Sequence, residues 1–246
     1  MHRGRAAALL ALLATTATVG GCATPGDSGP RPPTGTDSLV LRLSELPGML
    51  PPGGAAAVPP RFSLFGDGRL ISVPTGPAGG WPRLREDPVP PDGVRELLRR
   101  AAAVPERATA NDPDGPVVRV VIGSTDGQRT VTLPRADPAA TRLGESLARY
   151  AARPPVPYRP NAVAIVATPV DTPEPARPWP LPALAGEPLA GTAAGSTCLV
   201  LYGADLDAVQ RAAATADAAT PWRSGGRLWQ VTPRPLLPDE AGCADL

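Results

Sequence analysis

The sequence contains no lysine, and its single histidine is His2. Nucleophiles of the Ser-His-Asp, Cys-His and Ser-Lys kinds need a basic side chain beside them, and Schiff-base chemistry needs a lysine. Histidine is also a principal ligand of catalytic metals. Once the segment that carries His2 is removed, as argued below, these kinds of site are excluded. The sequence therefore predicts no catalytic residue, no metal site and no cofactor.

The chain also lacks an excess of charge of either sign. It has 24 Arg against 23 acidic residues. A near-neutral chain lacks the basic surface that nucleic acids require, so a nucleic-acid partner is excluded. Proline and glycine are abundant, at 35 and 26 residues. The prolines cluster between apolar runs, which favours ordered elements joined by long Pro-rich loops.

The N-terminus has the pattern of a secretory signal peptide. Arg3 and Arg5 give a positive start, 6–19 is uncharged and rich in Ala and Leu, and Gly20-Gly21 ends the run with small residues. This order of charge, short apolar core and small residues is typical of a cleaved export signal. The alternative is a retained membrane helix, which normally needs about 20 apolar residues.

The residues Val19-Gly20-Gly21-Cys22 resemble the bacterial lipobox, in which small residues precede an invariant cysteine. The resemblance implies cleavage before Cys22, a lipid on its thiol, and acylation of the new N-terminus with chains such as palmitate. Several acyl chains give stable anchoring. We therefore expect a signal peptide over 1–21 and a lipidated cysteine with a flexible stalk over 22–37. An extracytoplasmic domain follows over 38–246, with sub-units at 38–160 and 161–246, on the outer face of the cell membrane.

The pattern of the domain predicts an α+β fold, a mostly antiparallel sheet with hairpin-helix units, about three helices and long Pro-rich loops. Asp67-Gly68 and Asp126-Gly127 each lie between β-prone runs, which is typical of hairpins with type I′ turns. The remaining strands are expected at 38–43, 162–167, 198–202 and 227–232.

Each predicted helix begins after an aspartate. Asp92 precedes a helix over 93–104 whose apolar residues recur at the helical period. Asp137 and Pro138 form a strong start signal for the second helix. Asp205 caps the third. All three aspartates are expected to serve as N-caps.

With Cys22 assigned to lipid, Cys198 and Cys243 remain. Two cysteines outside the cytoplasm usually pair, so a disulfide is expected. The alternative is two reactive thiols, but no CxxC spacing or nearby basic residue supports it.

The four tryptophans supply the only candidate binding site. Trp81, Trp179 and Trp222 each adjoin a proline in a predicted loop, and Trp229 lies on the last strand. Rigid loop aromatics suit peptide or glycan binding. The alternative is that these rings fill the edge of the core beneath long loops. For binding, the best candidates are the two aromatics and two guanidiniums of the stretch 221–229: Trp222, Arg223, Arg227 and Trp229.

Several stretches together resemble a family of actinobacterial lipoproteins and secreted proteins with no known activity. They are Thr220-Pro221-Trp222, Ser224-Gly225-Gly226, Trp229, the run 235–240 ending at Gly242-Cys243, the hairpin 65–69 and the strand 39–42. The resemblance implies the envelope location and the Cys198–Cys243 pairing. We thus expect a non-catalytic envelope lipoprotein that binds an envelope protein or a cell-wall ligand. The alternatives are a carboxylate-based hydrolase of envelope polymers and a carrier of lipids or small molecules.

Overall fold

The computed structural model describes most of the chain after the N-terminal segment. The described residues are 29–49, 54–74, 80–105, 114–152, 154–171, 175–184, 186–189, 195–217 and 219–246. Residues 1–28 lie outside them, and so do the predicted signal peptide and Cys22. Within the described residues, no helix is both long enough and apolar enough to cross a membrane.

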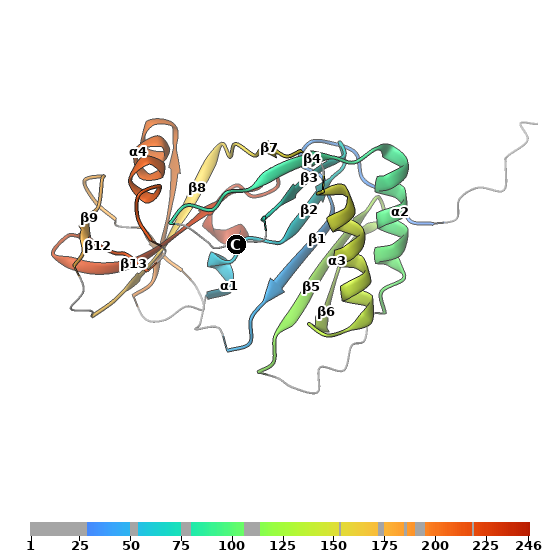
Figure 1. Ribbon diagram of the computed structural model, residues 1–246, viewed down its shortest axis with the longest axis horizontal. Coiled ribbons are helices and arrows are strands. Elements are labelled where there is room, and N and C mark those ends of the chain that lie inside the picture. The colour runs from blue at the N-terminus through green and yellow to red at the C-terminus, as the bar shows by residue number, and fades with distance from the viewer. Residues whose placement is uncertain are drawn as a thin grey trace, which may run out of the picture.

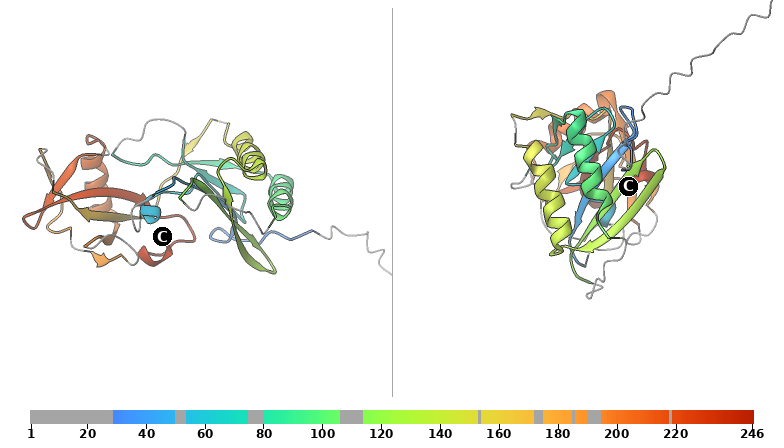
Figure 2. Two further views of the ribbon diagram at one scale, coloured as in Figure 1. Left: turned by 90° about the horizontal axis from the view of Figure 1, so that it is seen from below. Right: turned by 90° about the vertical axis from the view of Figure 1, so that its right-hand side faces the viewer.

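Two mostly antiparallel sheets, placed side by side along the long axis of the molecule, make up the α+β fold (Figures 1 and 2). The first has the strand order β6-β5-β1-β2-β3-β4-β7 and every pairing in it is antiparallel. Its strands are β1 (Leu39–Leu46), β2 (Phe62–Phe65), β3 (Arg69–Ser72), β4 (Arg85–Pro88), β5 (Val117–Ser124), β6 (Gly127–Pro134) and β7 (Val156–Pro157).

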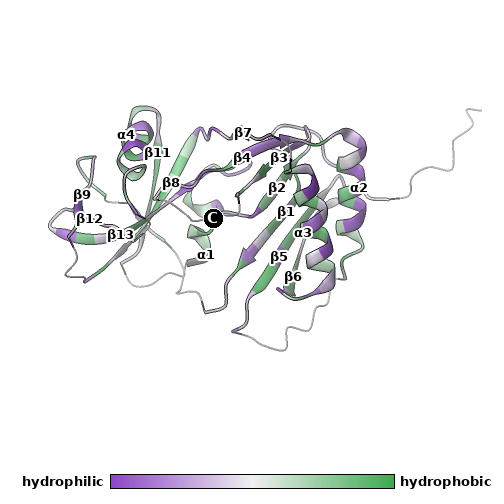
Figure 3. Cartoon of the chain, in the orientation of Figure 1, coloured by the Kyte–Doolittle hydropathy of each residue, from purple (hydrophilic) through white to green (hydrophobic). Residues whose placement is uncertain are grey.

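Two helices, α2 (Pro91–Ala102) and α3 (Pro138–Tyr150), run side by side over one face of the first sheet (Figure 2). Each presents one apolar stripe to the strands and polar residues to solvent, as the colouring of Figure 3 shows. The core between helices and sheet is almost entirely aliphatic. Its largest fully buried members are Leu41, Leu43, Leu64, Leu70, Leu97, Leu98, Leu133 and Leu147.

The second sheet has the order β10-β11-β8-β13-β12-β9, and its one parallel pairing joins β12 and β9. β8 is buried over Ala162–Ala167 because both of its faces are covered, one by α4 and the core of the second sheet and the other by Leu236 and its neighbours. The helix α4 (Gly203–Ala213) packs on this sheet. The strands are β8 (Ala162–Pro169), β9 (Arg177–Pro178), β10 (Glu187–Pro188), β11 (Thr197–Tyr202), β12 (Pro221–Ser224) and β13 (Arg227–Pro235); α1 (Gly54–Ala57) and the 3-10 helix η1 (Cys243–Asp245) are short.

The predicted elements are present, with corrections at their ends. Asp137 is an N-cap as expected, since its carboxylate accepts a hydrogen bond from Ala139 N at 2.7 Å. Asp92 and Asp205 are not caps, because α2 begins at Pro91 and α4 at Gly203, which places both carboxylates in the first turn. There they still favour the positive end of the helix dipole.

Both predicted hairpins form, but their turns are not type I′. That turn needs positive φ at both central residues, and neither Asp67 nor Asp126 has it. The β2–β3 loop instead spans 66–68, with Gly68 at φ 87°, and the β5–β6 loop is Thr125-Asp126, followed by Gly127 at φ 133°. The turn with two positive φ angles joins β12 and β13 at Gly225 and Gly226, with φ of 57° and 74°.

Candidate functional site: the junction of the two sheets

The last residues of the chain pack against both sheets. Leu237 is buried with Phe65 and Ile71 on the first sheet, on the side away from α2 and α3, and Leu236 is buried with Ala164 of β8. Cys198 of β11 and Cys243 of η1 form a disulfide with a Cα–Cα distance of 6.0 Å, which confirms the predicted pair. We call residues 236–246 the tail.

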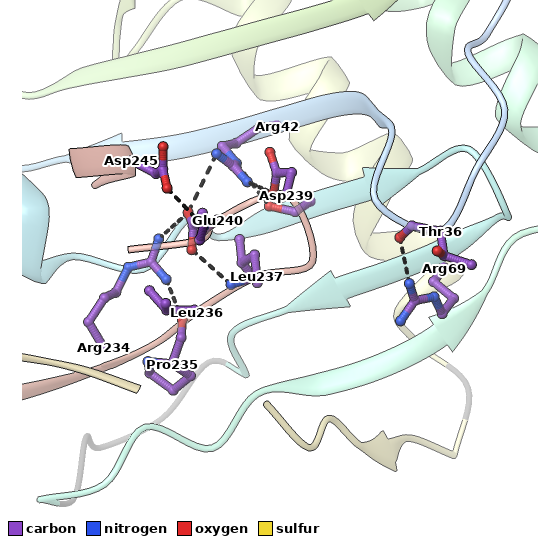
Figure 4. A network of polar contacts seen from close by, with 12 residues as sticks. Thr36, Arg42, Arg69, Arg234, Pro235, Leu236, Leu237, Asp239, Glu240 and Asp245 are labelled. Atoms are coloured by element: carbon purple, nitrogen blue, oxygen red, sulfur yellow. Dashed lines mark hydrogen bonds and ion pairs between the residues drawn. The ribbon is translucent and has the colours of Figure 1, made fainter. Parts of the chain in front are cut away.

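A cluster of four charged side chains holds the tail in place (Figure 4). Arg234 and Glu240 form an ion pair at 2.7 Å with side chains 3% and 2% exposed. Arg42 of β1 reaches Asp239 at 2.6 Å and Glu240 at 3.5 Å. The second oxygen of Glu240 accepts from Leu237 N at 2.8 Å. Burial raises the pKa of Asp239 and lowers that of Arg234, each opposed by the partner charges.

Two cavities open at the junction. Pro157 at the end of β7 lines both, and so do Tyr158 and Arg159 of the linker between β7 and β8. One has a volume of about 770 Å³ and includes tail residues in its wall; we call it the tail cavity. The other, of about 890 Å³, is lined by Trp81 and α4; we call it the Trp81 cavity. Both volumes are in the range of ligand sites, which often lie between structural units.

Three ionic groups of the tail cavity, Arg69, Glu86 and Glu240, are already partnered, whereas Asp37 and Arg159 have no side-chain partner within the described residues. Arg69 donates to Asp67 at 2.6 Å and to the carbonyl of Thr36 at 2.6 Å, and its guanidinium also lies 3.7 Å from Glu86. Glu240 belongs to the cluster described above. The rim is apolar, with Val156 and Tyr202 exposed to 61% and 58%.

Tyr158 fixes the linker between the two cavities. Its hydroxyl donates to the carbonyl of Leu236 at 2.9 Å. Burial raises the pKa of Tyr158 to about 12, against the effect of the Arg69 guanidinium. The phenol is therefore protonated at neutral pH and acts as a hydrogen-bond donor to the tail, not as a base.

One wall of the Trp81 cavity is a segment that crosses from the first sheet to the second. Gly80 N donates to the carbonyl of Ala216 at 3.1 Å, and a side chain at Gly80 would lie 2.5 Å from that oxygen, so only glycine fits. Trp81 is half-buried and packs against the core of the second sheet. Leu84 is buried against the first sheet. The segment is anchored at both ends, and Arg83 is exposed between them.

Arg83 and Arg159 are the free cationic side chains of the Trp81 cavity. Both side chains are exposed, and neither has a hydrogen bond or ion pair within the described residues. The third arginine of the lining, Arg85, is held by Ser72 at 3.1 Å and by Asp87 at 3.4 Å. Sequence reasoning singled out neither Arg83 nor Arg159. Arg83 stands two residues after Trp81, which is a signal, but nothing in the sequence brings Arg159 beside it.

The predicted site residues lie together on the β12–β13 hairpin. Trp222 pairs with Trp229 across the strands, and Ser224 pairs with Arg227. Trp222 is 5% exposed and meets Trp179 edge to face at 5.6 Å. Its burial favours the alternative interpretation, in which the ring fills the core. Trp229 is half-buried, and Arg223 and Arg227 are exposed with no side-chain partner in the described part of the chain. Binding by this hairpin stays a prediction.

The described residues contain no group of three or more His, Cys, Asp or Glu side chains placed to hold a metal ion. No family model, curated protein or solved structure matches the chain.

Proposed function

We propose that this protein is an envelope lipoprotein, anchored on the outer face of the cell membrane by a lipid on Cys22. Its two-sheet domain binds an envelope ligand at the junction and does not catalyse a reaction. The observation that carries the proposal is the Trp81 cavity, in which a half-buried tryptophan and two unpartnered guanidiniums, Arg83 and Arg159, line about 890 Å³ between the sheets. An aromatic with a few placed polar groups is the usual make-up of a ligand site.

The hydrolase alternative has less support. It needs a pair of available carboxyl groups in one cleft. Of the three acids that line the tail cavity, Glu86 faces Arg69, and the two oxygens of Glu240 accept hydrogen bonds from Arg234 and Leu237 N, which leaves Asp37 alone. The Trp81 cavity also has a single acid in its lining, Asp207. Neither His nor Lys follows residue 2 to serve as the second acid–base group. The carrier alternative requires an apolar cavity, whereas charged side chains line both of these.

The first test of the proposal concerns anchoring. We expect mass spectrometry of the protein from its native membrane to find an acylated N-terminal peptide beginning at Cys22. A Cys22→Ser variant should leave the membrane fraction. An unmodified peptide that still contains residues 1–21 would contradict the anchor.

The second test concerns the site. The full lipoprotein, solubilised in mild detergent, is mixed with isolated cell envelopes of its native cells and sedimented. We expect it to sediment with the envelopes and Trp81→Ala to reduce the bound fraction several-fold. Trp229→Ala is the matched control, because Trp229 is also half-buried and packs on the same core but does not line the cavity. Loss only in Trp229→Ala would place the site on the hairpin instead.

A further inference from the structure

We infer that the Trp81 cavity binds a saccharide that carries a carboxylate or phosphate group. The inference rests on the proposed function and names the ligand class of the same site. It is drawn from the charges that line the cavity, from its aromatic and polar side chains, and from the shortage of backbone donors in its wall.

The charge of the cavity is locally positive although the chain as a whole is near neutral. Arg83 and Arg159 are unpartnered among the described residues, whereas Arg85 is balanced by the fully buried Asp87 at 3.4 Å. The one acid in the lining is Asp207, which is exposed on α4. Two free guanidiniums outweigh one carboxylate. A guanidinium presents a planar set of donors that matches the oxygens of a carboxylate or phosphate.

The neutral part of the lining suits a sugar ring. Trp81 provides an amphipathic aromatic surface that is held in place by the core of the second sheet. Across the cavity, Asp207 and Gln210 stand on the exposed side of α4. A carboxylate accepts hydrogen bonds, and an amide both donates and accepts them. These two side chains can therefore pair with sugar hydroxyl groups, which also donate and accept.

A peptide is disfavoured because the wall offers few backbone donors. Recognition of an extended peptide by strand addition depends on main-chain hydrogen bonds, and proline has no N–H. Six prolines line the cavity: Pro74, Pro82, Pro155, Pro157, Pro160 and Pro235. Their fixed φ angles also keep the wall rigid, which lowers the ordering cost of binding. We therefore assign recognition of the ligand mainly to side chains.

The test is calorimetric titration of the full lipoprotein in detergent micelles with defined saccharides. Tetragalacturonate supplies carboxylates, its methyl ester is the uncharged counterpart, and mannose 6-phosphate with mannose forms the phosphate pair. We expect one or both anionic probes to bind at least about tenfold more tightly than the uncharged partner, since a charged hydrogen bond contributes on that order. The pair that shows the difference identifies the anionic group.

The variant Arg83→Gln/Arg159→Gln should weaken binding of the anionic probe by about 100-fold, on the order of tenfold for each guanidinium. Its Tm should equal that of the wild-type protein, because neither side chain has a partner to lose. Arg31→Gln/Arg119→Gln is the matched control. It removes the same charge from two exposed arginines that line neither cavity and have no side-chain partner within the described residues, and it should bind as the wild type does.

Four outcomes would overturn the inference. If charged and uncharged probes bind equally well, the ligand does not need an anionic group. If both double variants lose the same affinity, binding depends on the overall charge of the protein and not on this cavity. If no saccharide binds but Trp81→Ala still loses its envelope ligand, the ligand class is wrong while the proposed function stands. If neither effect is seen, both fail.

Discussion

The two halves of the molecule bury their apolar side chains in different ways. In the first, α2 and α3 cover a seven-stranded sheet over an aliphatic core that contains no cysteine. In the second, α4 covers a smaller core, in which Trp179 and Trp222 meet edge to face, and a disulfide closes the fold. A larger aliphatic core stabilises the first half, whereas the second half depends on its tryptophan pair and its disulfide.

The two halves are not independent, because the tail packs against both of them. Leu237 covers the first sheet, Leu236 covers the second, and Arg42 of β1 binds Asp239 and Glu240. The comparison can therefore be tested by changes that act on the tail as a whole, on the second half alone, or on one group.

The largest effect is expected from Glu240→Gln. The substitution leaves the buried Arg234 without its carboxylate, and removing one partner of a buried ion pair costs about 3 to 5 kcal/mol. Urea unfolding measures the loss in the free energy of unfolding. Glu96→Gln on α2 is the control, because its exposed pairs with Arg99 and Arg100 contribute less than about 1 kcal/mol. If both variants lose a similar free energy of unfolding, the buried tail cluster stabilises the fold no more than the exposed pairs of α2 do.

A smaller effect, about 2 to 4 kcal/mol, is expected from Cys198→Ser/Cys243→Ser, which opens a loop of 45 residues. The loss should be confined to the second half. Hydrogen exchange measures it: amides of β8 and β11 should exchange faster while those of β1 and β5 keep their protection. Equal loss of protection in both sheets would mean that the halves unfold as one unit, and the comparison would fail.

The smallest effect concerns Asp239, whose pKa is raised because it is buried. Because the pKa of this carboxyl is higher in the folded state than in the unfolded state, the folded state binds its proton more tightly. The associated stability is present below the unfolded pKa and is lost as pH rises through the folded value. The wild-type protein should therefore gain stability relative to Asp239→Asn as pH falls from neutral toward the ordinary range of aspartate. Thermal unfolding of both proteins across this range tests the sign, and a constant difference would contradict it.

The fold was largely predictable because its signals are local. Apolar periodicity and Asp137-Pro138 define the helices, and alternation with Asp-Gly defines the hairpins. The strands β4, β7, β9, β10 and β12 were not predicted. In β12, Pro221 and Trp222 were assigned to a loop; tertiary packing of Trp222 against Trp179 outweighs that local preference. The expected division at residue 160 falls between β7 and β8, where the chain passes from one sheet to the other.

The candidate site was less predictable because it is assembled from distant residues. Trp81 and Arg83 precede β4, Arg159 follows β7, and Gln210 stands on α4. No spacing rule joins residues that meet only when two sheets pack together. The sequence could indicate which aromatics were available for binding, but their burial, which separates Trp222 from Trp81, depends on the packing of the whole domain.

The tail also affects the order in which the fold can be completed. A chain emerges from the ribosome N-terminus first, and its domains usually fold in that order. Phe65 and Ile71 emerge early, whereas Leu237, which packs against them, follows much later in the chain. The first sheet therefore keeps part of this apolar face uncovered until the segment that carries Leu237 has been synthesised. A chain truncated between β7 and Leu237 would expose apolar side chains of the first sheet, far from the point of truncation.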